Sequence, residues 1–178
     1  ADALRSALTH HDIEDRCLAG LEHAQQFTWS NTAAAYSRTF VDVHIDRASK
    51  SIRRRPRVAY VTPWPPHRTG VAHYAQVMAS HLSKRVDLTL FVENPQEVDP
   101  PLYGMQVRGL TDLPSEAEQY DTVLYHIGNN TKFHRAIYQL AWEIPGVIVL
   151  HDYNINPFLN DAFLGTEQED LYYSAALE

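Results

Sequence analysis

Short apolar strand patterns alternate with helical patterns from residue 57 onward, and this alternation constrains the fold more than any other feature of the sequence. Residues 122–127 and 147–151 are almost continuously apolar, which is typical of strands that are covered on both faces. Repeated strand–helix–strand units of this kind predict a parallel sheet with right-handed crossovers. We therefore expect an α/β, doubly wound parallel sheet with helices on both faces.

The elements of this sheet domain can be placed along the chain. Strands are predicted over residues 57–62, 86–92, 103–110, 122–127 and 147–151. Helices are predicted over residues 70–84, 133–143 and 156–178. Because Gly104 and Gly109 interrupt the third strand, we expect that strand at an edge of the sheet.

Residues 1–46 have a different, purely helical pattern. Asp12 is placed to cap a first helix and Thr28 a second, and each helix has one apolar stripe. The stripes consist of Ile13, Cys17, Leu21 and Ala24 in the first helix and of Trp29, Ala33, Tyr36, Phe40 and Val43 in the second. Each stripe must be buried, either on the rest of this chain or on a neighbour. These helices are followed by a basic linker over residues 47–56 and by the sheet domain over residues 57–178.

The end of the sequence predicts a piece of a longer protein. Residues 156–178 have a helical pattern that is not followed by a closing strand. Leu177 and Glu178 resemble a cloning scar beside a tag. We therefore expect the sheet domain to be truncated.

Composition argues against several classes of protein. A net charge of −7 is unfavourable for a broad nucleic-acid-binding surface. The apolar runs are far shorter than the ~20 residues that a membrane span needs, and no secretory signal is visible. A single cysteine, Cys17, excludes a disulfide framework and a cysteine-rich zinc site within one chain. These features predict a cytoplasmic protein.

Three polar clusters follow predicted strands, at the points where those strands end. The first covers residues 63–70 after the first strand, and its candidates are Thr69 and Gly70 with the adjacent Val71. The second consists of Gly128, Asn129, Asn130 and Thr131 after the fourth strand, with His134 on the following turn, and the third of His151 and Asp152 after the fifth. In an open parallel sheet, ligands bind beyond the carboxyl ends of the strands. We therefore expect the three clusters to share one mouth, which is the candidate site.

Each cluster has a chemistry that suits a ligand and also a purely structural alternative. Gly70, at the start of a helix, allows close approach to N–H groups that favour anions, but the segment can also be a plain turn. The carboxamides of Asn129 and Asn130 suit sugar hydroxyls, although Asn is also common in turns. His151 can donate to a substrate oxygen while Asp152 organises the loop or the ring. The alternative there is a packed histidine followed by a helix cap.

Motifs of several other enzyme classes are missing from the sequence. There is no Gly-x-Gly for a dinucleotide, no phosphate-binding loop with its lysine, no Asp-x-Asp pair and no nucleophile elbow. A metal could be gathered by His126, His134, His151 and Asp152, but their spacing matches no known zinc pattern. We expect no metal and no tightly bound cofactor. A histidine-based metallohydrolase is kept as the less favoured alternative.

Two stretches of the sheet domain and one of the amino-terminal helices are distinctive. Residues 57–81 read R-V-A-Y-V-T-P-W-P-P-H-R-T-G-V-A-H-Y-A-Q-V-M-A-S-H, and residues 120–152 contain Y-H-I-G-N-N, F-H and P-G-V-I-V-L-H-D. Both resemble the Rossmann-like amino-terminal domain of group 1 glycosyltransferases, which are retaining enzymes of the GT-B fold. Residues 13–36, with A-G-L-E-H-A-Q-Q-F-T-W-S-N-T-A, are similar to the closing helices of the same family. The chain thus resembles the junction of two tandem modules, with one glycine, Gly70, where many members have two.

That resemblance implies a hexosyltransferase that uses a sugar nucleotide as co-substrate in polysaccharide or lipopolysaccharide-type biosynthesis. The parent protein would be cytoplasmic or lie at the inner face of the membrane. The donor would bind mainly to a carboxyl-terminal domain outside this sequence, and the present domain would supply the side of the cleft that binds a carbohydrate or glycolipid acceptor. The isolated fragment is expected to be inactive.

The same resemblance implies a role for each candidate residue. His151 would contact the transferred sugar beside Asp152, and Gly70 with its neighbours Thr69 and Val71 would face the diphosphate. The acceptor side would be shaped by Gly128, Asn129, Asn130 and His134. A non-catalytic carbohydrate-binding, nucleotide-binding or interaction module of the same fold is the alternative function. A glutamate-bearing second domain immediately downstream would distinguish the enzyme from the module.

Overall fold

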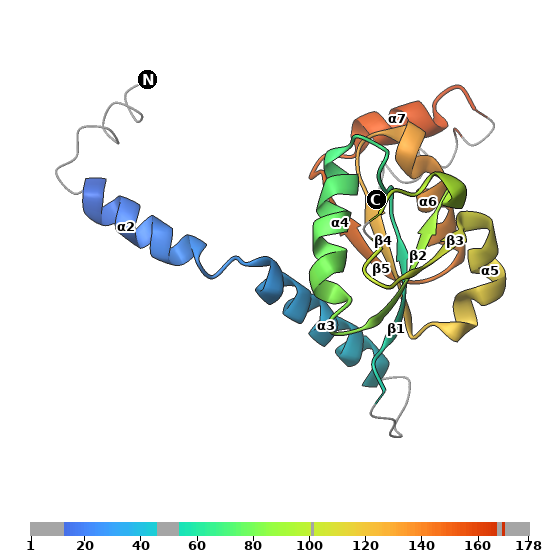
Figure 1. Ribbon diagram of the computed structural model, residues 1–178. Coiled ribbons are helices and arrows are strands. Elements are labelled where there is room, and N and C mark those ends of the chain that lie inside the picture. The colour runs from blue at the N-terminus through green and yellow to red at the C-terminus, as the bar shows by residue number, and fades with distance from the viewer. Residues whose placement is uncertain (1–12, 46–53, 101, 167–168, 170–178) are drawn as a thin grey trace.

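The computed structural model describes residues 13–45, 54–100, 102–166 and 169 of the chain. Its centre is a five-stranded parallel sheet with the strand order β3-β2-β1-β4-β5, and helices lie against both faces (Figure 1). The strands are β1 (Arg57–Val61), β2 (Asp87–Val92), β3 (Gln106–Gly109), β4 (Thr122–Ile127) and β5 (Val147–Leu150). The predicted α/β, Rossmann-like doubly wound fold is confirmed, with β3 at an edge as expected.

The helices fall close to their predicted positions, with one addition. The α-helices are α2 (Ile13–Ala24), α3 (Trp29–Ile45), α4 (Gly70–Leu82), α5 (Leu113–Glu116), α6 (Thr131–Glu143) and α7 (Asn156–Phe163). Three 3₁₀ turns are η1 (Pro95–Glu97), η2 (Leu110–Asp112) and η3 (Ala117–Gln119). The sequence does not predict α5, because four residues are too few to show a helical apolar stripe.

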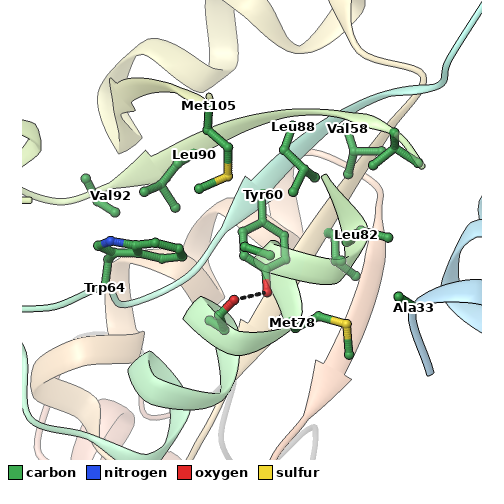
Figure 2. Close-up of a cluster of buried hydrophobic side chains, with 14 residues drawn as sticks. Ala33, Val58, Tyr60, Trp64, Met78, Leu82, Leu88, Leu90, Val92 and Met105 are labelled. Atoms are coloured by element: carbon green, nitrogen blue, oxygen red, sulfur yellow. Dashed lines mark hydrogen bonds between the residues drawn. The ribbon is translucent and has the colours of Figure 1, made fainter. Parts of the chain in front are cut away.

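Different helices cover the two faces of the sheet, because alternate residues of β1 point to opposite faces. Val58 and Tyr60 pack in one buried cluster with α4, and Tyr60 Oη donates a hydrogen bond to the Ala75 carbonyl oxygen at 3.0 Å (Figure 2). Ala59 and Val61 pack in a second cluster with residues of α5 and α6. The central strand is therefore buried on both faces, as the apolar pattern predicts.

The connection from β2 to β3 contains η1 but no α-helix, which differs from the predicted strand–helix repetition. The indole ring of Trp64, from the proline-rich loop after β1, lies instead in one buried cluster with Leu90, Val92 and Met105 (Figure 2). Trp64 Nε1 donates a hydrogen bond to the Asp99 carbonyl oxygen at 3.0 Å. A buried aromatic side chain thus covers the part of the sheet that a crossover helix would cover.

The edge strand β5 is only partly covered. Val147 and Val149 pack on the α4 face, whereas Ile148 and Leu150 point to the α6 face and are 49% and 54% exposed. The prediction that this apolar strand is covered on both faces is therefore wrong. The reason is the position of α6, because its buried Ile137 packs with the side chains of β4 and leaves the edge uncovered.

The two amino-terminal helices differ in their contacts. Helix α3 begins at its predicted cap, where the Asn31 N–H donates to Thr28 Oγ1 at 3.1 Å. It packs on α4, and the hydroxyl oxygens of Tyr36 and Tyr74 are 3.3 Å apart. Helix α2 extends away from the sheet (Figure 1), and its stripe residue Leu21 is 59% exposed. The apolar stripe of α3 is therefore packed on the rest of the same chain, which is one of the two expected possibilities. The stripe of α2 is not covered by the described residues.

The last predicted helix is shorter than expected. Helix α7 ends at Phe163, and Gly165 follows with a φ of 72°, a left-handed conformation that glycine adopts readily and that ends many helices. The prediction of one helix over residues 156–178 is therefore wrong at residues 164–166. Of the remainder of that prediction only residue 169 is described, and it is helical, whereas the other residues, including Leu177 and Glu178, lie outside the described part of the chain.

The basic linker is described only from residue 54, and the Asp12 cap also lies outside the described residues. Arg54 forms a bidentate pair with Asp121, with N···O distances of 2.6 and 2.7 Å, and Arg55 Nε lies 3.3 Å from Asp87 Oδ1. The carboxyl-terminal end of the linker is thus attached to the sheet domain.

Among the described helices, none combines the length and apolarity that crossing a bilayer requires.

The turn before β5 supplies a test of the packing. A Cβ added to Gly146 would lie 2.5 Å from the Val123 carbonyl oxygen and 2.7 Å from Cε2 of Tyr125. Because the backbone of β4 cannot move aside, we expect Gly146→Ala to lower the free energy of unfolding by about 1–3 kcal/mol. Urea denaturation followed by tryptophan fluorescence measures this change. Gly20→Ala is the control, because an added Cβ on exposed α2 meets nothing within 4 Å and alanine favours a helix, so this change should not lower the midpoint. An unchanged midpoint for Gly146→Ala would contradict this packing.

Candidate functional site

Strands β1 and β4 are neighbours in the sheet, but the chain leaves them toward opposite faces. After β1 it enters α4 on one face, and after β4 it enters α6 on the other. Such a reversal leaves a crevice beyond the carboxyl ends of the two strands, where ligands bind in open α/β sheets. The loop after β5 begins at the same edge, because β5 runs parallel to β4.

The three polar clusters meet at Gly128. A Cβ added to this glycine would lie 3.1 Å from His134 Nε2, 3.1 Å from Val71 Cγ2 and 3.3 Å from Asp152 Oδ2. These three side chains come from α6, from α4 and from the loop after β5. The structure therefore brings the three clusters to one mouth, as the positions of the strand ends lead us to expect, and the three segments pack closely around a buried glycine that leaves no room for a side chain.

Asp152 connects two of the loops at this mouth. Its Oδ2 accepts a hydrogen bond from the Asn129 N–H at 2.8 Å, and Asn129 Nδ2 donates to the Asn154 carbonyl oxygen at 2.5 Å. Asp152 does not cap the next helix, because α7 begins at Asn156 with Ile155 at the cap position, so that structural alternative is wrong. The Asp152 carboxylate instead fixes the loop after β4 relative to the loop after β5.

His151 pairs with a second histidine inside the sheet. Its Nε2 lies 2.9 Å from Nδ1 of His126, which is a hydrogen-bond distance. The His126 ring is fully buried near the end of β4, with the Tyr60 ring 4.9 Å away between centroids. The Tyr74 ring of α4 meets His151 edge-on at 4.8 Å. The ring of His151 is therefore held by one hydrogen bond and one aromatic contact.

A third histidine, His134, is buried, and the backbone fixes the position of its proton. Its Nδ1 lies 3.2 Å from the His126 carbonyl oxygen, and a carbonyl can only accept, so Nδ1 carries the proton. The pKa of His134 is lowered to about 4, mainly because the ring is buried, although the hydrogen bond to the His126 backbone opposes part of this effect. Burial also lowers the pKa of His151, and burial together with the nearby His151 lowers the pKa of His126 well below 6.5. At neutral pH all three rings are uncharged.

Two of the predicted site residues cap helices with their side chains. Thr69 Oγ1 accepts a hydrogen bond from the Ala72 N–H at 3.0 Å at the start of α4, and Asn130 Oδ1 accepts one from the Lys132 N–H at 3.1 Å at the start of α6. These two positions therefore offer a ligand mainly the amino end of a helix, which favours negative charge. An added Cβ at Gly70 meets nothing within 4 Å, so the first turn of α4 is open to approach.

The arrangement of the histidines does not suit a metal. His126 Nδ1 and His151 Nε2 point at each other across 2.9 Å, whereas two ligands of one metal would both direct lone pairs at a third point. Within the described part of the chain, no group of three or more His, Cys, Asp or Glu side chains is placed to hold a metal ion. The geometry favours hydrogen bonding over coordination at this mouth.

Tyr74 and His126 have roles at the mouth that sequence reasoning missed. The apolar spacing of residues 71, 74, 75, 78 and 82 predicts Tyr74 on the inner side of α4, where the structure has it, and the predicted strand over residues 122–127 has His126 near its end. Their contacts with His151 depend on how α4 crosses the sheet and on the register of β4 with β5, in which His126 pairs with Val149. A local sequence pattern reveals neither the crossing of α4 over the sheet nor the register of the two strands. The alternation along β4 gives a partial signal, since it places His126 on the face that α4 covers.

Comparisons with protein-family models, with curated proteins and with solved structures give no match to this chain. The interpretation of the site therefore depends on its geometry and on the chemistry of its residues.

The buried histidines predict a loss of stability in acid. Because folding lowers their pKa values, the unfolded chain binds more protons than the folded chain below about pH 6.5, so the free energy of unfolding falls as the pH falls. For His134 the fall continues to about pH 4, the folded pKa of that ring. We expect His134 alone to account for a loss of about 1–2 kcal/mol between pH 7 and pH 5. Urea denaturation at the two pH values measures the loss.

The variant His134→Gln separates this effect from general acid sensitivity. Glutamine keeps a side-chain donor but does not titrate, so the loss between pH 7 and pH 5 should become smaller by the same amount. His73→Gln, at an exposed position of α4, is the matched control and should leave the loss as it is in the parent chain. An equal pH dependence in all three proteins would contradict the assignment.

Proposed function

We propose that this chain supplies the amino-terminal sheet domain of a retaining glycosyltransferase that uses a sugar nucleotide. In this proposal the mouth forms the acceptor side of a cleft, and the donor binds mainly to a second Rossmann-like domain that these 178 residues do not include. The chain alone is then inactive. The acceptor is a carbohydrate or glycolipid, and the setting is polysaccharide or lipopolysaccharide-type biosynthesis in the cytoplasm or at the inner face of the membrane.

The observation that carries the proposal is the convergence on Gly128. Three chain segments, each following a different strand, place His134, Val71 and Asp152 within 3.1–3.3 Å of the Cβ position of one glycine. Such close packing holds the polar groups of the three segments in fixed positions beyond the carboxyl ends of the strands, where a second substrate would bind. The family resemblance places the reacting groups at the same residues.

The chemistry of the mouth suits a reaction in which a diphosphate leaves. Negative charge develops on that leaving group, and fixed dipoles that point at it lower the barrier. The amino ends of α4 and α6 both lie at the mouth, beside Gly70 and Asn130. Each helix has 13 residues, long enough for a full macrodipole at its end. In the proposal Gly70 and its neighbours face the diphosphate.

The uncharged imidazoles suit the sugar side of the same reaction. A neutral histidine offers one donor and one acceptor, which matches the hydroxyl and ring oxygens of a sugar. His151 would contact the transferred sugar, and His134 with Asn129 would shape the acceptor side. Asp152 acts indirectly in this proposal, because its carboxylate oxygen already accepts the Asn129 N–H.

Binding can be tested on the chain itself. We expect methyl glycosides and the probes UDP-glucose and GDP-mannose to shift the amide and imidazole NMR signals of Gly128, Asn129 and His151. Gly128→Val would force apart the three segments that meet at this glycine and should abolish these shifts, whereas Gly20→Ala on α2 should preserve them. Shifts confined to residues at the opposite, amino ends of the strands would contradict the proposed site.

Catalysis is tested in the full-length protein that contains this sequence. We expect His151→Ala to lower sugar transfer at least about a hundredfold, since a group that contacts the transferred sugar stabilises the transition state. The domain should stay folded, and its urea midpoint verifies this. His73→Ala is the control and should transfer at the parent rate. Normal transfer by His151→Ala would remove this histidine from catalysis, and binding without any transfer by the parent protein would favour the non-catalytic module.

A further inference from the structure

Two uncharged imidazoles face each other at the mouth, and only one of the facing nitrogens can carry a proton. His126 Nδ1 and His151 Nε2 are 2.9 Å apart. If His126 donates, its own Nε2 is bare and the proton of His151 is on Nδ1. If His151 donates, the proton of His126 is on Nε2 and His151 Nδ1 is bare. The two arrangements give the mouth opposite chemistry.

The surroundings of His126 Nε2 distinguish the two arrangements. This atom is buried and has no hydrogen-bond partner among the residues that the structure describes. Besides His151, the rings of Tyr60 and Tyr74 pack against the His126 ring, and the Tyr60 hydroxyl already donates to the Ala75 carbonyl oxygen. An N–H without an acceptor is the rarest kind of unpaired buried group, and burying one costs about 1–3 kcal/mol. The arrangement with a bare Nε2 on His126 is therefore favoured.

We propose that His126 is a positioning residue, whose Nδ1–H donates to His151 Nε2 and so holds the proton of His151 on Nδ1, the nitrogen left for a ligand. His151 Nδ1 has no hydrogen-bond partner in the described part of the chain, and the ring is only partly buried. His151 then meets a ligand oxygen as a hydrogen-bond donor. It does not act as a base through Nε2, because His126 already occupies that nitrogen.

The neighbouring His134 offers a hydrogen-bond acceptor where His151 offers a donor. Its Nδ1–H donates to the His126 carbonyl oxygen, so its Nε2 is a bare acceptor, and this atom lies 3.1 Å from the Cβ position of Gly128. The mouth thus presents one N–H donor and one bare nitrogen, both on uncharged rings. A hydroxyl group can accept from the first and donate to the second, whereas a phosphate oxygen can only accept. This choice of a hydroxyl-bearing ligand rests on the proposed function, but the proton positions do not.

The proton positions can be measured on the unliganded chain. Two-bond ¹H–¹⁵N correlation spectra of the histidine rings at pH 7 distinguish a protonated ring nitrogen from a bare one. We expect Nδ1 to be protonated and Nε2 to be bare in both His126 and His151. A proton on Nε2 of His151, or two protons on either ring, would overturn the inference. Because no ligand is present, that result would leave the proposed function to be decided by the sugar titration.

Matched variants test the consequence for binding. Asparagine places an N–H donor close to the position of the histidine Nδ1, whereas leucine has a similar shape and no donor. We therefore expect His126→Asn to keep the His151 proton on Nδ1 and His126→Leu to release it. His151→Asn should retain methyl glycoside binding and His151→Leu should weaken it roughly tenfold, the equivalent of one hydrogen bond. A His126→Leu protein whose His151 nitrogen shifts equal those of the parent chain would also overturn the inference.

These experiments still test the inference if one of the variants does not fold. His126 is fully buried, so His126→Leu can lose stability for reasons of packing alone. The ring spectra of the parent chain then decide the proton positions without any variant. His151 is partly exposed, and the comparison of His151→Asn with His151→Leu then supplies the binding test.

Discussion

The position of β1 between β2 and β4 determines both the core and the mouth of this protein. Each neighbour pairs with β1 in parallel, and the residues Val58–Val61 are fully buried between two helical layers. Because the helices that follow β1 and β4 lie on opposite faces, the chain separates beyond the ends of these two strands, where ligands bind in open α/β sheets. The site is a direct consequence of this strand order, and the polar residues of three loops are brought together by it.

The fold could be predicted from the sequence where local pattern and tertiary environment agree. Strand β4 is almost continuously apolar and is covered on both faces, and its predicted bounds equal the observed ones. The same argument fails for β5, because coverage depends on where α6 lies and not on the strand itself. It fails again between β2 and β3, where Trp64 covers the sheet in place of a helix. A tryptophan in a proline-rich loop does not by itself reveal which strands it covers.

For the site, the sequence could predict which residues gather but not how they are bonded. Strand ends are local features, so the meeting of His134, Val71 and Asp152 could be expected before the structure. The bond between His126 and His151 depends on the register of two strands and on the backbone bond from the His151 N–H to the Ile127 carbonyl oxygen at 2.8 Å. A shift of one residue in that register would turn the neighbouring side chains to the other face of the sheet.

The contacts of α3 make this helix part of the same folded unit as the sheet. The sequence divides the chain near residue 46, yet α3 packs on α4 through Tyr74, whose ring meets Trp29 at 5.0 Å and His151 at 4.8 Å. The Tyr36 hydroxyl lies 3.3 Å from that of Tyr74. A tyrosine held on one side by α3 cannot turn away from His151 without breaking these contacts. Helix α3 therefore belongs physically to the sheet domain, because it holds in place the aromatic ring against which the histidine of the mouth is packed.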